Sequence, residues 1–359
     1  MAFVKVEKVA IRGISGCVPK NVEENKDLSV YASQEEAMQV IEATGIERRH
    51  VTDANTTASD LCFKAAEKLI EELNWDKESI DILAFCTQNP DYLNLPNSFV
   101  VHDKLGLSEN TMCVDYYHGC PGWVVSLCNV ATQIAASSST GIKRAILLDG
   151  DTVTKMQYAK DREELPLFGD AGTAVALEFD ETAAPMYFNI GTKSEDSKSL
   201  VRLNGGFRNP YTIESLKHEI DLRSGVSSDF SVSGKMDGMD VFSFAITKAP
   251  KAMKKLCSEF NIEVQSIDNL VLHQANKLIV ENVAKRMKVP MDKVPMSLTN
   301  YGNTTSASIP LTMVSCCGDN LTNGICRNLV CGFGTGLAWG AAYFETYNII
   351  CPKIVKYDE

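Results

Sequence analysis

The stretch CVDYYHGCPGWVVSL, residues 113–127, joins a β-rich apolar run to a Gly-Cys-Pro-Gly turn and then to a helical pattern. Proline is favoured in the first turn of a helix, because its missing N–H costs nothing there. We therefore expect Pro121 to begin the helix and Cys120 to cap it. A thiol at that position feels the positive end of the helix dipole, which predicts a lowered pKa and a nucleophilic thiolate. The alternative interpretation is a small residue that fills a tight turn.

Outward from this stretch, short apolar runs alternate with helical patterns along the chain. The runs 80–87, 145–148, 270–272 and 329–331 predict strands, several of them apolar on both faces. Apolar residues at i, i+3, i+4, i+7 spacing predict a helix that includes Cys62, Ala65, Ala66, Leu69, Ile70 and Leu73. This alternation predicts an α/β layered fold.

Both halves contain a strand, a turn with a reactive side chain and a helix. The least regular segment is the polar stretch 193–237, and we place the boundary between the halves near residue 180. Residues 1–180 then carry Cys120, and residues 181–359 carry His273 and Asn303.

Composition excludes several classes of protein. The 359 residues are 45% hydrophobic and 23% charged, which is ordinary for a globular protein with a sizeable core. The net charge of −11 argues against a nucleic-acid partner. The 12 cysteines are scattered without a C-x-x-C pair, so we expect no metal site and a reducing cytoplasm. No apolar run approaches the roughly eighteen residues of a membrane span, so we expect no membrane partner.

His273 and Asn303 are the candidate partners of the thiol. His273 ends the strand NLVLH and is expected to open the helix QANKLIVENVAKRM, where a neutral imidazole resists protonation and can donate a hydrogen bond. Asn303 lies in NYGNTTSASIP, residues 300–310, where its amide could stabilise an enolate or thioester oxygen. The alternatives are a satisfied core histidine and an asparagine that caps a turn.

A glycine-rich segment, GFGTGLAWG at residues 332–340, follows a predicted strand. It lacks the lysine of a phosphate-binding P-loop, so we expect a backbone oxyanion donor, with Thr335 as the first candidate. His118 is too close in sequence to Cys120 to act as its base, and pocket lining is the expected role. Asp170 is expected to be a turn aspartate at a strand end.

With Gly-Cys-Pro-Gly, His-Gln-Ala-Asn, Tyr-Gly-Asn-Thr and Gly-Phe-Gly-x-Gly in this order, the chain resembles β-ketoacyl-[acyl-carrier-protein] synthase III of the thiolase superfamily. The resemblance runs from ISGCVPKNVEENKDL to LAWG, nearly end to end. It implies a thiolase-like five-layer αβαβα fold made of two similar halves, a homodimer, and a place in fatty-acid or polyketide biosynthesis.

The resemblance also implies roles for the candidate residues. Cys120 would accept an acyl group from coenzyme A or a carrier-protein thioester, and its N–H and that of Thr335 would hold the oxyanion. His273 and Asn303 would stabilise the enolate that forms when a malonyl thioester loses carbon dioxide. Acyl-CoA or acyl carrier protein would be substrates, and no further cofactor is implied.

Pocket and docking residues follow from the same resemblance. Leu95, His118, Phe242 and Gly334 would line the acyl pocket, with Leu95 acting across a dimer interface. The basic residues Lys277, Lys285 and Arg286 would dock an acidic acyl carrier protein, although they could equally form a solvated helix face. Gln39 and Ala43 stand where the family commonly has a tryptophan and an arginine that hold the adenine of coenzyme A, which leaves the acyl donor open.

Three rival functions stay open at this point. A non-decarboxylating acyltransferase of the same fold could move the acyl group to an N, O or S acceptor, although it would not need both His273 and Asn303. A hydroxymethylglutaryl-type synthase needs a glutamate acid/base, and no recognisable motif supplies one. A catalytically silent partner subunit is hard to reconcile with a complete set of Cys, His and Asn.

Overall fold

Two β-sheets form the centre of the computed structural model, which describes residues 2–157, 159–202, 205–210, 212 and 235–357. The first sheet has the order β15 (Val355–Tyr357), β2 (Val9–Pro19), β8 (Ala171–Phe179), β7 (Arg144–Asp151), β5 (Ile82–Thr87) and β6 (Met112–Tyr117). The second has the order β1 (Ala2–Val6), β9 (Met186–Thr192), β14 (Ala338–Tyr347), β13 (Ile325–Gly334) and β12 (Asn269–Leu272). Two short pairs, β3 (Val22–Glu24) with β4 (Arg48–His50) and β10 (Leu200–Val201) with β11 (Lys235–Met236), lie beside them.

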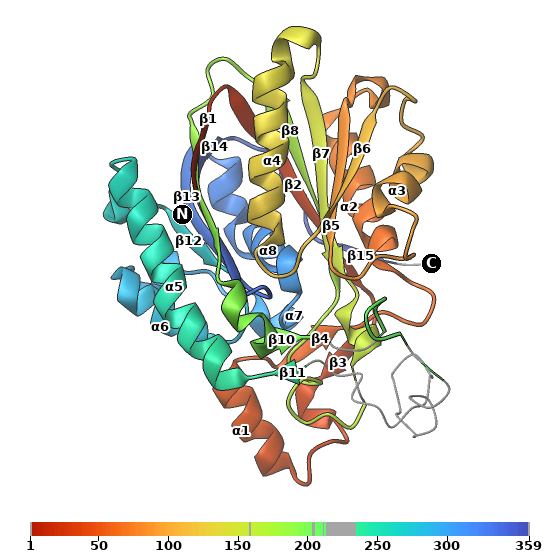
Figure 1. The fold of residues 1–359 in the computed structure, drawn as a ribbon, viewed down its shortest axis with the longest axis vertical. Coiled ribbons are helices and arrows are strands. Elements are labelled where there is room, and N and C mark those ends of the chain that lie inside the picture. Colours follow the sequence, from red (N-terminus) through yellow and green to blue (C-terminus); the bar gives the residue numbers. More distant parts are fainter. Residues whose placement is uncertain (1, 158, 203–204, 211, 213–234, 358–359) are drawn as a thin grey trace.

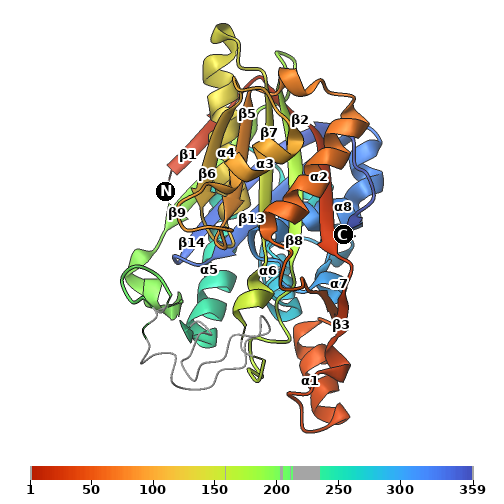
Figure 2. The ribbon, with the colours of Figure 1, turned by 90° about the vertical axis from the view of Figure 1, so that its right-hand side faces the viewer.

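Helices cover both outer faces of the sheets and fill the space between them (Figure 1). Helices α4 (Gly122–Ser137) and α8 (Ser308–Thr322) lie between the sheets, and α2 (Ala58–Leu73) and α3 (Asn97–Leu105) cover the first sheet (Figure 2). Helices α5 (Gly238–Glu259) and α6 (Lys277–Met287) cover the second. The remaining helices are α1 (Gln34–Thr44), which contacts α6, and the short α7 (Leu298–Tyr301).

Three buried apolar clusters separate these layers. The central cluster joins α4 and α8 to the inner faces of both sheets, and Trp123 is its largest fully buried side chain. One outer cluster packs α2 and α3 on the first sheet, and the other packs α5 and α6 on the second. Helix pair, sheet, helix pair, sheet and helix pair follow one another, so the predicted five-layer α/β fold is confirmed.

The expected strands and the expected helix are present. The strand expected at 80–87 is shorter, at Ile82–Thr87, and the other three strands are longer than expected. The terminal strands, however, exchange between the halves: β1 belongs to the second sheet, and β15 pairs in parallel with β2 in the first. Position 180 falls between β8 and β9, which belong to different sheets. Most of the polar stretch 193–237, namely 203–204, 211 and 213–234, lies outside the described residues.

Two helix starts differ from the prediction. Helix α4 begins at Gly122 with Pro121 as its N-cap, so Cys120 precedes the cap instead of occupying it. Helix α6 begins at Lys277, because the Asn276 side chain accepts the Ile279 N–H at 2.9 Å and caps the helix there. His273 therefore lies four residues before α6 and does not open it.

Among the described residues, no helix is both long enough and apolar enough to cross a membrane.

Candidate active site

The nucleophile candidate Cys120 lies in the tight connection from β6 to α4, under the turn between β13 and β14. The Cys120 residue is 7% exposed. A Cβ added at Gly334 would lie 2.7 Å from the Cys120 sulfur, and one at Gly119 would lie 3.0 Å from the Thr335 Cβ. The backbone N–H groups of Cys120 and Thr335 both form hydrogen bonds that favour a charged sulfur. The glycines thus let two backbone donors approach the thiol.

Burial nevertheless raises the pKa of Cys120 to about 11, so the prediction of a lowered pKa is wrong. Removal of the thiolate from water outweighs the hydrogen bonds from Thr335 and from its own N–H, and the negative charge of Asp151 adds to the rise. The one-residue shift of the helix start also leaves Cys120 outside the first turn, where the dipole acts. Cys120 is a protonated thiol at neutral pH.

His273 follows β12 and is almost fully buried, at 2% exposure. Its Nδ1 lies 2.8 Å from the Ser308 hydroxyl oxygen, and its ring packs edge-on against Phe333 at 5.5 Å between centroids. Burial lowers the pKa of His273 to about 4, and a hydrogen bond to the backbone of Thr305 opposes that shift. The ring is neutral at pH 7, as expected, but burial is the cause and a helix end is not.

Both backbone polar groups of Asn303 form hydrogen bonds. Its N–H donates to the Leu167 carbonyl at 2.8 Å, and its carbonyl accepts the Gly169 N–H at 3.2 Å. Its side-chain Oδ1 accepts the Thr305 N–H at 2.9 Å. Because this bond occupies the oxygen, the Nδ2 group is left as the hydrogen-bond donor of the amide.

These groups meet between the two sheets. The His273 N–H donates to the Cys331 carbonyl at 2.9 Å. A Cβ on the next residue, Gly332, would lie 3.0 Å from the Cys120 carbonyl oxygen. Thr305 touches both other candidates: its backbone bonds to His273 and to Asn303. The structure therefore brings Cys120, His273 and Asn303 to one buried site, with the nucleophile from the first half of the sequence and the other two from the second.

The four predicted pocket residues differ in position. Gly334 touches the sulfur region directly, and His118 is half-buried beside Gly122. Phe242 lies in the first turns of α5 and packs on the outer core of the second sheet. Leu95 is 42% exposed on the segment before α3, so it can line a pocket only if a second copy covers it.

The predicted docking residues belong to a larger basic surface, here called the α5–α6 face. Lys285 and Arg286 are exposed in the last turn of α6, and Lys277 pairs with Glu281 at 4.0 Å. The face also includes Lys251, Lys254 and Lys255 of α5, which the sequence analysis missed although their spacing places them on one side of a helix.

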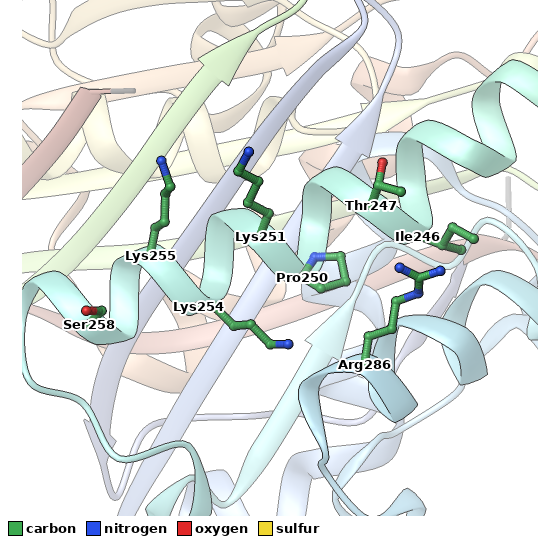
Figure 3. Close-up of a pocket in the computed structure, with 8 residues that line it drawn as sticks. All are labelled: Ile246, Thr247, Pro250, Lys251, Lys254, Lys255, Ser258 and Arg286. Carbon is green, nitrogen blue, oxygen red and sulfur yellow. The ribbon is translucent and has the colours of Figure 1, made fainter.

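A surface cavity of about 380 Å³ lies between the two helices of this face. Figure 3 shows Arg286 pointing from α6 toward α5, with Lys254 extending beside the gap. In the described part of the chain, no acidic side chain forms an ion pair with Lys251, Lys254, Lys255 or Arg286. Within their bounds α5 and α6 carry seven basic and three acidic residues, on a chain whose net charge is −11.

The structure also describes Asp170, Gln39 and Ala43, which the sequence analysis discussed. Asp170 is fully buried directly before β8 and accepts hydrogen bonds from Thr52 and Thr154, as expected of a structural turn aspartate. Gln39 and Ala43 are exposed on α1. Within the described ranges, no group of three or more His, Cys, Asp or Glu side chains is arranged to hold a metal ion.

Sequence reasoning also missed Asp151, Thr305 and Ser308, which surround the donors. Ser308 contacts the His273 ring, and Thr305 is bonded to the buried Asp151. An aspartate directly after an apolar strand is the only signal that the sequence offers for Asp151, and it is typical of many turns.

Comparisons with known proteins identify one family. The family model described as 3-oxoacyl-[acyl-carrier-protein (ACP)] synthase III matches residues 114–194. The model of the C-terminal part of that family matches residues 257–346. The β-ketoacyl-[acyl-carrier-protein] synthase III of Fusobacterium nucleatum is 30% identical over 347 residues, which are 95% of this chain and 99% of that protein. The protein of that name from Clostridium perfringens strain SM101 is 30% identical over 344 residues, 95% and 100% of the two chains.

Solved structures give the same picture. The crystal structure of a 3-oxoacyl-(acyl-carrier protein) synthase from Burkholderia xenovorans LB400 superposes with a TM-score of 0.88 at 31% identity. The superposition covers 98% of each chain.

Proposed function

The chain belongs to the 3-oxoacyl-[acyl-carrier-protein] synthase III family, and from this premise we propose that Cys120, His273 and Asn303 carry out its chemistry. It is an acyltransferase of the decarboxylative condensing type. The observation that carries the proposal is a buried thiol facing two backbone N–H donors, with a neutral imidazole and an amide in the same site.

In the first half-reaction, the Cys120 sulfur attacks the carbonyl carbon of an acyl thioester. A C–S bond forms to Cys120, the bond to the donor sulfur breaks, and the proton of the Cys120 thiol ends on the departing thiol. The N–H groups of Cys120 and Thr335 would stabilise the oxyanion of the tetrahedral intermediate. Because burial raises the pKa of Cys120 to about 11, the thiol must lose its proton in the course of this half-reaction.

In the second half-reaction, a malonyl thioester loses carbon dioxide and its electron pair becomes an enolate. The enolate carbon attacks the acyl carbon, which releases the Cys120 sulfur and forms the new C–C bond. His273 and the Nδ2 group of Asn303 would hold the enolate oxygen, because a donor at that oxygen lowers the barrier without a strong base. Dividing the condensation in this way makes each transfer easier.

Intact-protein mass spectrometry tests this assignment. Incubation with acyl-CoA or acyl-carrier donors should add one acyl mass to the wild-type chain, and Cys120→Ser should abolish the adduct. Cys316→Ser is the matched control, because Cys316 is an exposed thiol in α8 and its loss should change nothing. An adduct that persists in Cys120→Ser would contradict the assignment. Release of carbon dioxide from malonyl carrier then separates condensation from simple acyl transfer.

The partner that delivers the thioester is an acyl carrier protein, docked on the α5–α6 face. Carrier proteins are acidic, and this face offers lysine and arginine side chains that no described acidic group neutralises. Lys251, Lys254 and Lys255 of α5 add to Lys277, Lys285 and Arg286 on this surface. Such a field mainly raises the association rate and weakens with salt.

A second copy of the chain completes the assembly. Strand β6 is an edge of the first sheet and pairs only with β5 among the described strands. Beside it the surface exposes large apolar side chains, with Tyr117 at 80%, Leu93 at 77% and Phe99 at 51%. An unprotected apolar edge strand favours pairing with another strand. A homodimer through β6 would also bring Leu95 against the partner copy, and sedimentation equilibrium of Tyr117→Lys tests it by the loss of the dimer.

The proposed chemistry needs no cofactor beyond the thioester substrates, since the thiol and the donors of the chain supply every group that it requires. All 12 cysteines are free thiols, which suits a reducing compartment such as the cytoplasm.

A further inference from the structure

Asp151 lies at the end of β7, behind the candidate site, and is 1% exposed. One carboxylate oxygen accepts the Thr87 hydroxyl at 2.7 Å and the N–H groups of Gln88 and Asn89 at 2.9 and 3.2 Å. The other oxygen accepts the hydroxyl of Thr305. A single buried carboxylate thus joins the end of β5 in one sheet to the segment that follows Asn303.

Thr305 has an unusual backbone that this bond can hold. Its φ is +54°, in the left-handed region that β-branched residues rarely adopt. A conformation of this kind persists only where surrounding contacts impose it. The Thr305 hydroxyl donates its one hydrogen to Asp151, and the Thr304 carbonyl, 2.8 Å from the same oxygen, is a second acceptor for that hydrogen.

The backbone of Thr305 is what touches the two donors. Its N–H binds the Asn303 Oδ1 at 2.9 Å, which directs the amide Nδ2 away from Thr305. The Thr305 backbone also contacts the His273 ring, and this contact opposes the lowering of the His273 pKa. A rotation of Thr305 would therefore move both donors together.

We propose that Asp151 is a positioning residue for the condensation: it holds Thr305 in its left-handed conformation and thereby orients both Asn303 and His273. This inference rests on the proposed function of the site and adds a residue outside the three that react. Asp151 acts on the decarboxylation half-reaction, because its link runs to the enolate donors. The N–H groups that serve acylation belong to Cys120 and Thr335, which Thr305 does not hold.

The charge of Asp151 gives a second, independent consequence. Its negative charge raises the pKa of Cys120, so removal of the charge should make the thiol more acidic. Other titratable groups face the same region and stay in place in the variant. They are Asp149 on β7, Cys62 on α2, Cys86 on β5 and, across Thr305, His273.

The main test is Thr305→Val, which keeps the β-branched shape and removes the bond to Asp151. We expect carbon dioxide release from malonyl carrier to fall about 10- to 100-fold, the effect of a small misplacement of a reacting group, while acyl-Cys120 formation changes less than about threefold. The matched control is Thr304→Val, because the buried Thr304 hydroxyl has no hydrogen-bond partner among the described residues, and it should keep both half-reactions. Thr305→Ser, which retains the hydroxyl, should restore most of the decarboxylation.

Asp151→Asn separates charge from folding. In this variant, the rate of Cys120 alkylation by iodoacetamide should rise at lower pH than in the wild type. A purely structural loss would not produce this change. Equal loss of both half-reactions in Thr305→Val, or no loss in either, would overturn the inference. If the wild-type chain itself neither acylates nor releases carbon dioxide, the proposed function fails instead, and the alkylation profile still reports on Asp151.

Discussion

The candidate active site, here called the buried centre, and the α5–α6 face differ in how charged their side chains are. In the centre, every reactive group is neutral at pH 7 or is a carboxylate tied by several donors, since burial raises the pKa of Cys120 to about 11 and lowers that of His273 to about 4. On the face, Lys251, Lys254 and Arg286 are ion-paired with no acidic side chain of the described chain. The centre thus depends on fixed short contacts, and the face on long-range attraction.

This difference predicts which experiments affect which region. Changes in the centre should alter rates of single half-reactions and be insensitive to salt, whereas changes on the face should alter encounter with the carrier and vanish at high ionic strength. The predictions below run from the largest expected effect to the smallest.

Asn303→Asp should have the largest effect on the centre. The side chain keeps an oxygen to accept the Thr305 N–H but loses the Nδ2 donor and places a negative charge near the enolate. We expect decarboxylation of malonyl carrier to fall about 100- to 1,000-fold, with acylation of Cys120 largely kept. Single-turnover assays of both half-reactions measure this, and the exposed Asn323→Asp is the control. Retained decarboxylation would remove Asn303 from the mechanism.

The protonation state of Cys120 predicts slow alkylation. Because the pKa of Cys120 is raised to about 11, the rate with iodoacetamide should climb with pH throughout the range 7–10 without a plateau. A shift of about 2 units from an ordinary thiol corresponds to roughly 100-fold less thiolate at neutral pH. Peptide mapping should find Cys316 modified before Cys120. A plateau below pH 8 would restore the thiolate that the sequence pattern predicted.

Gly334→Ala tests the close approach of the β13–β14 turn. The added methyl would lie 2.7 Å from the Cys120 sulfur and 2.8 Å from its Cβ, at a φ of +155°. We expect acylation of Cys120 to slow about 10- to 100-fold, because the Thr335 N–H must move with the turn. Gly238→Ala is the control, since, apart from its chain neighbours and the backbone of its own helix, no described atom lies within 4 Å of a Cβ there. An unchanged acylation rate would show that the turn does not position the oxyanion donor.

Charge reversal on the face should have the smallest effect. Lys251→Glu combined with Lys254→Glu and Lys255→Glu should raise the KM for an acyl carrier substrate about tenfold at low salt and leave acylation by acyl-CoA unchanged. The difference should shrink as salt increases. The control is Lys64→Glu with Lys68→Glu on α2, on the opposite outer layer. A rise in KM with both donors would indicate damage to the centre and not loss of docking.

Much of the site could be read from the sequence because its residues stand at turns with strong local signals. Gly-Cys-Pro-Gly marks Cys120, and the apolar strand before His273 marks the second half of the site. The predicted helix starts were less accurate. Pro121 is the N-cap of α4, and Asn276, three residues after His273, is the N-cap of α6. Several residues near a helix start can serve as its N-cap, and the local sequence pattern does not decide between them.

From the sequence, periodicity predicted the α/β class, and turn chemistry marked Cys120, His273 and Asn303 as candidates, because both are local properties. The five-layer order, the grouping of the three residues and the docking residues on α6 were expectations from the resemblance to the synthase III family. Only the tertiary structure decided the ionisation of Cys120, the link from Asp151 through Thr305 to both donors, and the joining of α5 with α6 in one basic surface. Each of these depends on burial or on contacts between segments far apart in the chain, such as Asp151 and Thr305. Desolvation and long-range contacts leave no local trace in a sequence.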